Sequence, residues 1–111
     1  MNPFFSGLAA VVLLVASSSA MAGKGQCHAA AIKQAKALLN FHVGGDDRIA
    51  IEDVVKELPS ISNPAAPQQR FKVLEVWGTI YKGSYRMHLI YYPIENECVL
   101  MGQEVLEFAR L

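Results

Sequence analysis

The chain has 111 residues with ten Lys or Arg and ten Asp or Glu, so its formal net charge at pH 7 is zero. This balance gives no electrostatic reason to propose nucleic acid or an anionic membrane as a partner. The length indicates one domain, and a domain this small is only marginally stable without a covalent staple.

Residues 1–22 have the pattern of a secretory signal peptide. They carry no charged side chain, residues 4–16 form an almost continuous apolar run, and small residues ending in Ala20-Met21-Ala22 follow. We therefore predict cleavage after Ala22, which leaves an exported domain of residues 23–111 with no membrane span. The n-region lacks Lys and Arg, so a retained membrane anchor stays as the alternative, although the apolar run is short for a span.

Two helices are predicted next. Residues 26–42 place apolar side chains at helical spacing, and Gly44-Gly45 ends that helix. Asp46-Asp47 then has the character of a helix N-terminus. The apolar positions of the second predicted helix follow the i, i+3, i+4, i+7 pattern: Ile51, Val54, Val55 and Leu58.

The second helix is expected to end at Pro59, because proline cannot continue a helix. Residues 60–69, with two further prolines, are predicted to be a polar irregular connector.

Residues 70–107 are rich in β-branched and aromatic side chains, which predicts three consecutive antiparallel strands. Gly83-Ser84 fits the centre of a type II′ turn, and a second turn is expected at Glu95-Asn96. The predicted fold class is therefore α+β, with two N-terminal helices packed on one face of a three-stranded meander sheet.

Alternation of side chains along the strands divides this sheet into two faces. We call the face toward the helices the core face, and its predicted members are Leu74, Val76, Gly78, Ile80, Lys82, Tyr85, Met87, Leu89, Tyr91, Cys98, Leu100, Gly102, Glu104 and Leu106. The opposite face, which no predicted element must cover, is the free face. Gly78 and Gly102 flank Leu89 in this register, which indicates a close approach of the first helix to both glycines.

Cys27 and Cys98 are the only cysteines, and in an oxidising compartment the default is that they form a disulfide. The bond would tie the first helix to the third strand. A metal site of Cys27, His28, His88 and Cys98 is the alternative, but no closely spaced ligand pair of the zinc type is present. We expect no metal and no cofactor.

The sequence does not favour an enzyme. The three histidines His28, His42 and His88 fall on different predicted elements, and no nucleophile-elbow, zinc-protease or phosphate-binding motif occurs. Redox catalysis is also disfavoured, because there is no Cys-x-x-Cys.

The free face is the candidate binding surface, because it combines the aromatic, Met and Arg groups that are typical of binding hot spots. Its members are Trp77, Thr79, Tyr81, Arg86, His88, Ile90, Met101 and Gln103. The alternative is that Trp77 is packed internally, beneath the connector or against a second copy of the chain.

Three strings carry a resemblance to a known family: residues 73–78 (VLEVWG), 85–87 (YRM) and 98–104 (CVLMGQE). In these strings the chain resembles the small secreted pseudomonad proteins grouped as quorum-sensing-regulated virulence factors. The resemblance implies a secreted single-domain protein without a defined biochemical activity, and it supplies no active-site residues.

A looser, architectural similarity links the predicted element order to small outer-membrane assembly lipoproteins of the BamE/SmpA type and to the β-lactamase-inhibitor fold. The chain lacks a lipidated cysteine of the former, and fold analogy alone assigns no function. We therefore expect a secreted or periplasmic binding protein, monomeric or homodimeric, that contacts a host or bacterial envelope protein. The alternative is a periplasmic inhibitor or an envelope-assembly accessory protein.

Overall fold

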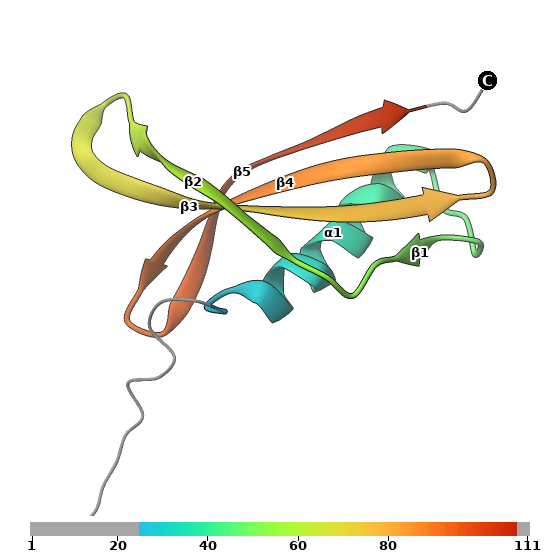
Figure 1. Cartoon of the computed structure of the whole chain (residues 1–111), viewed down its shortest axis with the longest axis horizontal. Coiled ribbons are helices and arrows are strands. Elements are labelled where there is room, and N and C mark those ends of the chain that lie inside the picture. Colours follow the sequence, from blue (N-terminus) through green and yellow to red (C-terminus); the bar gives the residue numbers. More distant parts are fainter. Residues whose placement is uncertain (1–24, 109–111) are drawn as a thin grey trace, which may run out of the picture.

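The computed structural model describes residues 25–108, in which one helix packs on a curled antiparallel sheet (Figure 1). The elements in chain order are α1 (His28–Val43), β1 (Ala50–Ile51), β2 (Lys56–Asn63), β3 (Ala66–Ile80), β4 (Gly83–Ile94) and β5 (Glu97–Phe108). The sheet has five strands in the order β1-β3-β4-β5, and β2 pairs with the same edge of β3 as β1. The predicted signal peptide lies outside the described residues.

The predicted fold class, two helices on a three-stranded sheet, is wrong in its element count. The first helix is confirmed as α1, which ends at Gly44 with a φ of 76°. The amide of Gly45 donates to the carbonyl of Asn40 at 2.9 Å, as expected of a glycine cap.

The second predicted helix does not form. Asp46 accepts the backbone N–H of Arg48 at 2.9 Å, which is a local turn rather than a helix cap. Ala50 and Ile51 pair with Thr79 and Gly78 of β3 as β1. Of the four apolar residues that match helical spacing, Ile51 and Leu58 are in strands that pair with the edge of β3. Val54 and Val55 lie in the segment between β1 and β2.

The predicted irregular connector is also wrong, because residues 60–69 belong to a β2–β3 hairpin. Asn63 accepts the backbone N–H of Ala65 at 3.0 Å in its turn. Pro59, predicted to stop a helix, instead lies where the β2–β3 register shifts between Leu58 and Ile61. An edge strand tolerates a proline at such an irregularity, because the missing N–H has no ladder partner to lose.

The β3–β4 hairpin is confirmed with a different turn. Ile80 pairs with Gly83, so Tyr81 and Lys82 occupy the turn instead of Gly83-Ser84. Val76 therefore lies opposite Met87 rather than Tyr91. The register moves by an even number of residues, so every β3 and β4 side chain keeps its predicted face.

The β4–β5 turn at Glu95-Asn96 is confirmed, because Ile94 pairs with Glu97 and Tyr91 with Leu100. Beyond this point the predicted register is wrong. Ile90 pairs with Gly102, which leaves Met101 as an extra residue in β5. The bulge reverses the faces of residues 102–108 relative to the prediction, since side chains alternate with a period of two.

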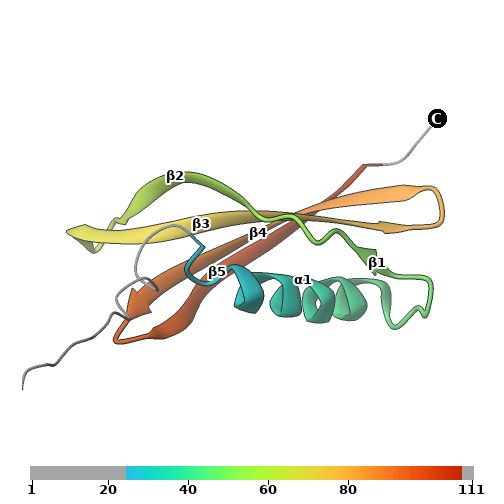
Figure 2. The same ribbon diagram turned by 60° about the horizontal axis from the view of Figure 1, so that its bottom comes forward.

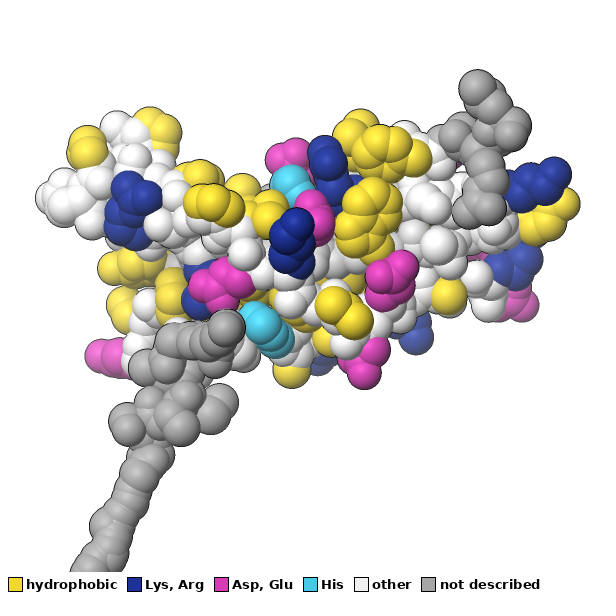
Figure 3. Space-filling view, in the orientation of Figure 1, with side chains coloured by type: hydrophobic (Ala, Val, Ile, Leu, Met, Phe, Trp, Pro, Cys, Tyr) yellow, Lys and Arg dark blue, Asp and Glu magenta, His cyan; other side chains and the backbone are white. Residues whose placement is uncertain are grey.

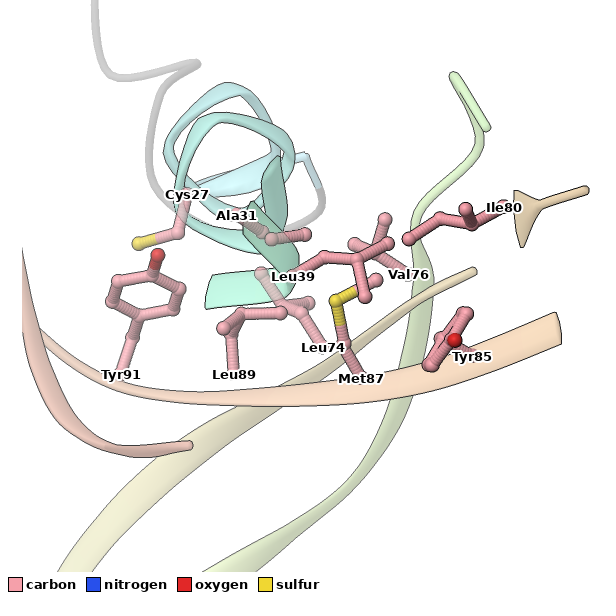
Figure 4. Close-up of a cluster of buried hydrophobic side chains, with 11 residues drawn as sticks. Cys27, Ala31, Leu39, Leu74, Val76, Ile80, Tyr85, Met87, Leu89 and Tyr91 are labelled. Carbon is pink, nitrogen blue, oxygen red and sulfur yellow. The ribbon is translucent and has the colours of Figure 1, made fainter. Parts of the chain in front are cut away.

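The core lies between α1 and the core face of the sheet (Figures 2 and 4). Ala31, Ala35 and Leu39 of α1 are buried against β3 and β4, where Leu74, Val76, Met87 and Leu89 are fully buried. The close approach predicted at Gly78 is confirmed, because a Cβ there would lie 2.9 Å from Leu39 Cδ2. The same prediction for Gly102 is wrong, since Gly102 lies on the free face.

The predicted disulfide between Cys27 and Cys98 is present, with the two Cα atoms 5.7 Å apart. It joins Cys27, the residue before α1, to Cys98, the second residue of β5. The bond therefore holds the N-terminal end of the helix onto the end of the sheet that carries the β4–β5 turn.

Candidate functional site

The free face is the side of the sheet turned away from α1, and α1 is the one helix among residues 25–108 (Figure 2). Its members alternate with the core residues: odd-numbered positions of β3, even-numbered positions of β4 and, after the bulge, even-numbered positions of β5. In Figure 3 a histidine and charged side chains of both signs gather at the centre of the view, with hydrophobic side chains beside them.

Glu75 of β3 is the centre of a polar group on this face. Its Oε1 accepts a hydrogen bond from the Trp77 indole Nε1 at 3.2 Å, and its Oε2 accepts one from Nε2 of His88 at 2.9 Å. Arg86 Nε lies 3.9 Å from the same Oε2. Burial raises the pKa of Glu75, but the hydrogen bonds from His88 and Trp77 and the nearby charge of Lys56 outweigh it and lower the pKa below its ordinary value.

His88 links three strands across the free face. It lies directly opposite Glu75 of β3 and opposite Glu104 of β5. Its second ring nitrogen, Nδ1, is 3.9 Å from Glu104 Oε1. The Glu75 and His88 side chains are only 12% and 19% exposed, whereas Glu104 is 64% exposed and reaches solvent. The polar group therefore has a largely buried Glu75–His88 pair at its centre and an exposed carboxylate, Glu104, at its margin.

An aromatic group borders the polar group. The rings of Trp77 and Phe108 lie 5.7 Å apart between centroids, and the Arg86 guanidinium lies 5.5 Å from the Phe108 centroid. Leu106, next to Arg86 in the register, is exposed. A cation on an aromatic ring beside exposed apolar side chains is a composition that protein partners bind.

The His88–Glu75 pair resembles the base and orienting carboxylate of a hydrolytic site, but no hydroxyl on β4 is placed for it. Ser84 is four residues from His88 along the strand, which corresponds to about 13 Å at the usual strand rise. A nucleophile must be within hydrogen-bond reach of its base. Both cysteines are in the disulfide. Besides His88, the Glu75 carboxylate contacts Trp77 and Arg86.

No group of three His, Cys, Asp or Glu residues within residues 25–108 is arranged to hold a metal ion. The alternative site of Cys27, His28, His88 and Cys98 is not assembled, because the cysteines are bonded to each other and His88 lies on the other face of the sheet.

The structure brings together five of the eight predicted binding residues on the free face: Trp77, Thr79, Arg86, His88 and Ile90. The other three lie elsewhere. Tyr81 is in the β3–β4 turn, Met101 is the extra residue of the bulge, and Gln103 is on the core face, where Gln34 of α1 donates to it at 2.9 Å.

Sequence reasoning did not expect Glu104 and Phe108 on this face, and although strand alternation placed Glu75 on it, the contact between Glu75 and His88 was missed. Glu75 was placed opposite Tyr92 because the turn was set at Gly83-Ser84. Glu104 and Phe108 depend on the bulge, which shifts them to the free face. A signal for the first error was present, since two-residue turns are also compatible with Tyr81-Lys82 followed by glycine.

A shallow hollow of about 370 Å³ lies on the core-face side of the sheet, between the β3–β4 turn and the end of α1. Arg48 on its rim is paired with Asp46 at 2.8 Å and lies 5.7 Å from the Tyr81 ring centroid. This ion pair lowers the pKa of Asp46 to about 2. Burial and the neighbouring Glu107 carboxylate raise the pKa of Tyr85. Lys82, also on its rim, lies 5.5 Å from the centroid of the same Tyr81 ring.

Comparisons with protein families, curated proteins and solved structures find no match to this chain. No helix among residues 25–108 is long and apolar enough to cross a bilayer. Function must therefore be argued from the geometry of the free face.

Proposed function

We propose that this protein is an exported, non-enzymatic binding protein that contacts a protein partner through the free face of its sheet. The observation that carries the proposal is the Trp77–Phe108–Arg86 group, in which Trp77 donates a hydrogen bond to Glu75 and Arg86 lies 3.9 Å from the same carboxylate. Trp and Arg groups on an ordered base lose little conformational entropy on binding, which is why they dominate hot spots.

Export is supported by the signal-peptide pattern of residues 1–22 and by the disulfide, since disulfides persist in oxidising compartments. Intact mass of the native protein from periplasm and from culture supernatant tests this. A mass that starts at Gly23, with thiols alkylated only after reduction, supports export, and the fraction that contains it separates periplasmic from extracellular action. A full-length mass with freely alkylated cysteines would contradict it.

A role as a quorum-sensing-regulated virulence factor follows from the sequence resemblance alone. It predicts that the partner is a host protein. An envelope protein or a periplasmic hydrolase as the partner would instead favour an assembly accessory or an inhibitor, the alternative function.

The binding test compares two matched pairs of substitutions. Arg86→Ala with Phe108→Ala removes a basic and an aromatic side chain from the free face. Lys36→Ala with Phe41→Ala removes the same two kinds of side chain from α1, where both are exposed. Each variant is first checked for an unchanged circular dichroism spectrum, because a misfolded variant would lose binding for the wrong reason.

Cross-linking and quantitative mass spectrometry then measure which proteins each variant retains. We expect a partner that the wild type and the α1 variant capture and that the free-face variant loses by at least about tenfold, which is about 1.4 kcal/mol of binding free energy. Equal capture by all three proteins would refute binding through the free face.

A further inference from the structure

The hollow between the β3–β4 turn and the end of α1 is separate from the free face, because it lies on the core-face side of the sheet. Its volume of about 370 Å³ is at the lower end of the range of about 300–1,000 Å³ that is typical of small-molecule sites. Part of its lining is apolar: Val43, Ile80 and the ring of Tyr85. Ile80 and Tyr85 lie at the end of the core cluster away from Cys27 (Figure 4). The hollow therefore has the size and apolar lining that suit a small molecule.

The rim of the hollow at the β3–β4 turn is positively charged. Tyr81 of this turn is 76% exposed, and two cations lie over its ring, the Arg48 guanidinium at 5.7 Å and the Lys82 ammonium at 5.5 Å from the centroid. Arg48 is already engaged, because its Nε and Nη2 donate to the two oxygens of Asp46 at 3.0 and 2.8 Å. Lys82 takes part in none of the ion pairs within residues 25–108. Its ammonium therefore keeps its three hydrogen-bond donors for a ligand.

The inner wall of the hollow, where β4 pairs with β5, is negatively charged. Glu107 lies opposite Tyr85 in this ladder and is 54% exposed. The Nε2 atom of His42 is 3.9 Å from the Glu107 carboxylate, which is beyond hydrogen-bond distance. Burial raises the pKa of Tyr85, and the charges of Glu107 and Asp46 raise it further, because both oppose a negative charge on the phenol. The hollow thus has a free cation at its rim and an incompletely paired carboxylate at its inner wall.

We propose that the hollow binds a small zwitterion with an apolar body, a free apolar amino acid or a short peptide of such residues. The ligand carboxylate accepts hydrogen bonds from the Lys82 ammonium, and the ligand ammonium donates to the Glu107 carboxylate. The apolar body of the ligand contacts Val43 and Ile80. This site lies apart from the Trp77 group, so the proposal goes beyond the proposed function and does not depend on it.

The balance of charge in the lining favours a zwitterion over a simple ion. Two cations and two carboxylates line the hollow: Arg48, Lys82, Asp46 and Glu107. An anion that approaches Lys82 is repelled by Glu107, and a cation that approaches Glu107 is repelled by Lys82. A cation would also compete with Arg48 and Lys82 for the Tyr81 ring. A ligand with both charges is attracted at both ends.

Four compounds test the proposal. L-leucine is the short zwitterion, N-acetyl-L-leucine lacks its ammonium and L-leucinamide lacks its carboxylate. L-leucyl-L-leucine is the longer zwitterion, which separates a free amino acid from a short peptide as the ligand. Binding to the intact, oxidised protein is measured by titration of its backbone amide signals in NMR, because the residues whose signals shift also locate the site.

We expect one of the two zwitterions to shift the amide signals of Ile80 and Gly83 and to bind at least about tenfold more tightly than either blocked leucine. The zwitterion that binds more tightly identifies the length of the ligand.

Two substitutions assign the ends of the ligand. Lys82→Gln should weaken the zwitterion about tenfold and leave L-leucinamide unchanged, because that compound has no carboxylate. Glu107→Gln should weaken the zwitterion similarly and leave N-acetyl-L-leucine unchanged, because that compound has no ammonium. Lys33→Gln with Glu97→Gln neutralises one charge of each sign at exposed positions outside the hollow and should change no affinity. Each variant is first checked for an unchanged circular dichroism spectrum.

Equal binding of the three leucine compounds would overturn the proposal, because apolar contact alone would then explain binding. So would the absence of any shift, or shifts confined to the free face around Trp77. If Lys82→Gln weakened L-leucine and L-leucinamide equally, Lys82 would not hold the carboxylate and the proposed site would be wrong. Capture of a protein partner by the Arg86→Ala with Phe108→Ala variant is a separate readout, so failure of the hollow and failure of the proposed function are distinguishable.

Discussion

Gly78→Ala tests the closest contact between the helix and the sheet. A Cβ at this position would lie 2.9 Å from Leu39 Cδ2, 3.0 Å from Ile51 Cδ1 and 3.2 Å from Met87 Cε. Leu39 and Met87 are fully buried, so neither side chain moves without disturbing its own neighbours. The methyl group therefore overpacks the core at the point where β1, α1 and β4 meet on β3.

The expected loss in the free energy of unfolding of Gly78→Ala is the difference between two opposing effects. An extra methyl group in a packed core costs about 1–3 kcal/mol. Replacing Gly by Ala also reduces the entropy of the unfolded chain, which stabilises the fold by about 0.4–1 kcal/mol. Gly78→Ala should therefore lower the free energy of unfolding by about 1–2 kcal/mol.

Gly102→Ala is the matched control, because it is also a strand glycine. Its Cβ would lie 3.5 Å from Ile90 Cδ1, an ordinary contact on the free face. Only the entropy effect then remains, so Gly102→Ala should be neutral or stabilising by up to about 1 kcal/mol.

Urea unfolding followed by the fluorescence of Trp77, the one tryptophan of the chain, measures both variants. For a domain of this size a loss of 1–2 kcal/mol lowers the melting temperature by about 4–15 °C. Equal stability of the two variants, or a Gly78→Ala protein as stable as wild type, would refute the close approach of α1 to Gly78.

Three further predictions concern the Cys27–Cys98 disulfide, the polar group around Glu75 and the bulge in β5. Cys27→Ser with Cys98→Ser should lower stability by about 4 kcal/mol, the loop-entropy value for a sequence separation of 71, and reduction of the wild type should lower its melting temperature similarly. Glu75→Gln should cost about 1–2 kcal/mol at neutral pH, because it removes charge-assisted hydrogen bonds. The folded-state pKa of Glu75 is lowered, so this contribution is present above the unfolded pKa of about 4.3 and is lost as pH falls through the folded pKa. Urea titrations at several pH values should show the variant and wild type converging in acid; a constant difference would contradict this assignment. Val105→Asp should unfold the domain, whereas Leu106→Asp should not, as judged by circular dichroism, since the bulge puts only Val105 against the core. The reverse result would mean that β5 has no bulge.

Sequence reasoning succeeded for the free face wherever strand alternation alone decides the outcome. Trp77 and His88 were placed correctly on the free face, and Val76 and Met87 on the core face, although the predicted turn was wrong. An even shift in register leaves faces unchanged, so this part of the prediction did not depend on the exact turn.

Sequence reasoning failed where the exact pairing of two strands decides which side chains lie opposite each other. Glu75 faces His88 only because the turn lies at Tyr81-Lys82, and Glu104 faces His88 only because β5 contains one extra residue. Gly102 is the one local signal near Met101, since glycine within a strand often marks a bulge, but it does not fix which residue is the extra one. For this reason the hydrogen-bonded polar group of the candidate site cannot be predicted until the register of the strands is known.

The residues by themselves determined α1, the β4–β5 turn, the faces of β3 and β4, and the pairing of the two cysteines. Helical spacing predicts α1, turn-forming residues predict the β4–β5 turn, and alternation predicts the faces of β3 and β4. The disulfide follows because the chain has only two cysteines. The tertiary structure alone decided that residues 50–51 and 56–63 are strand. Their spacing suits a helix, but the open edge of β3 offers ladder hydrogen bonds and packing beside Gly78 that a separate helix would leave unmade.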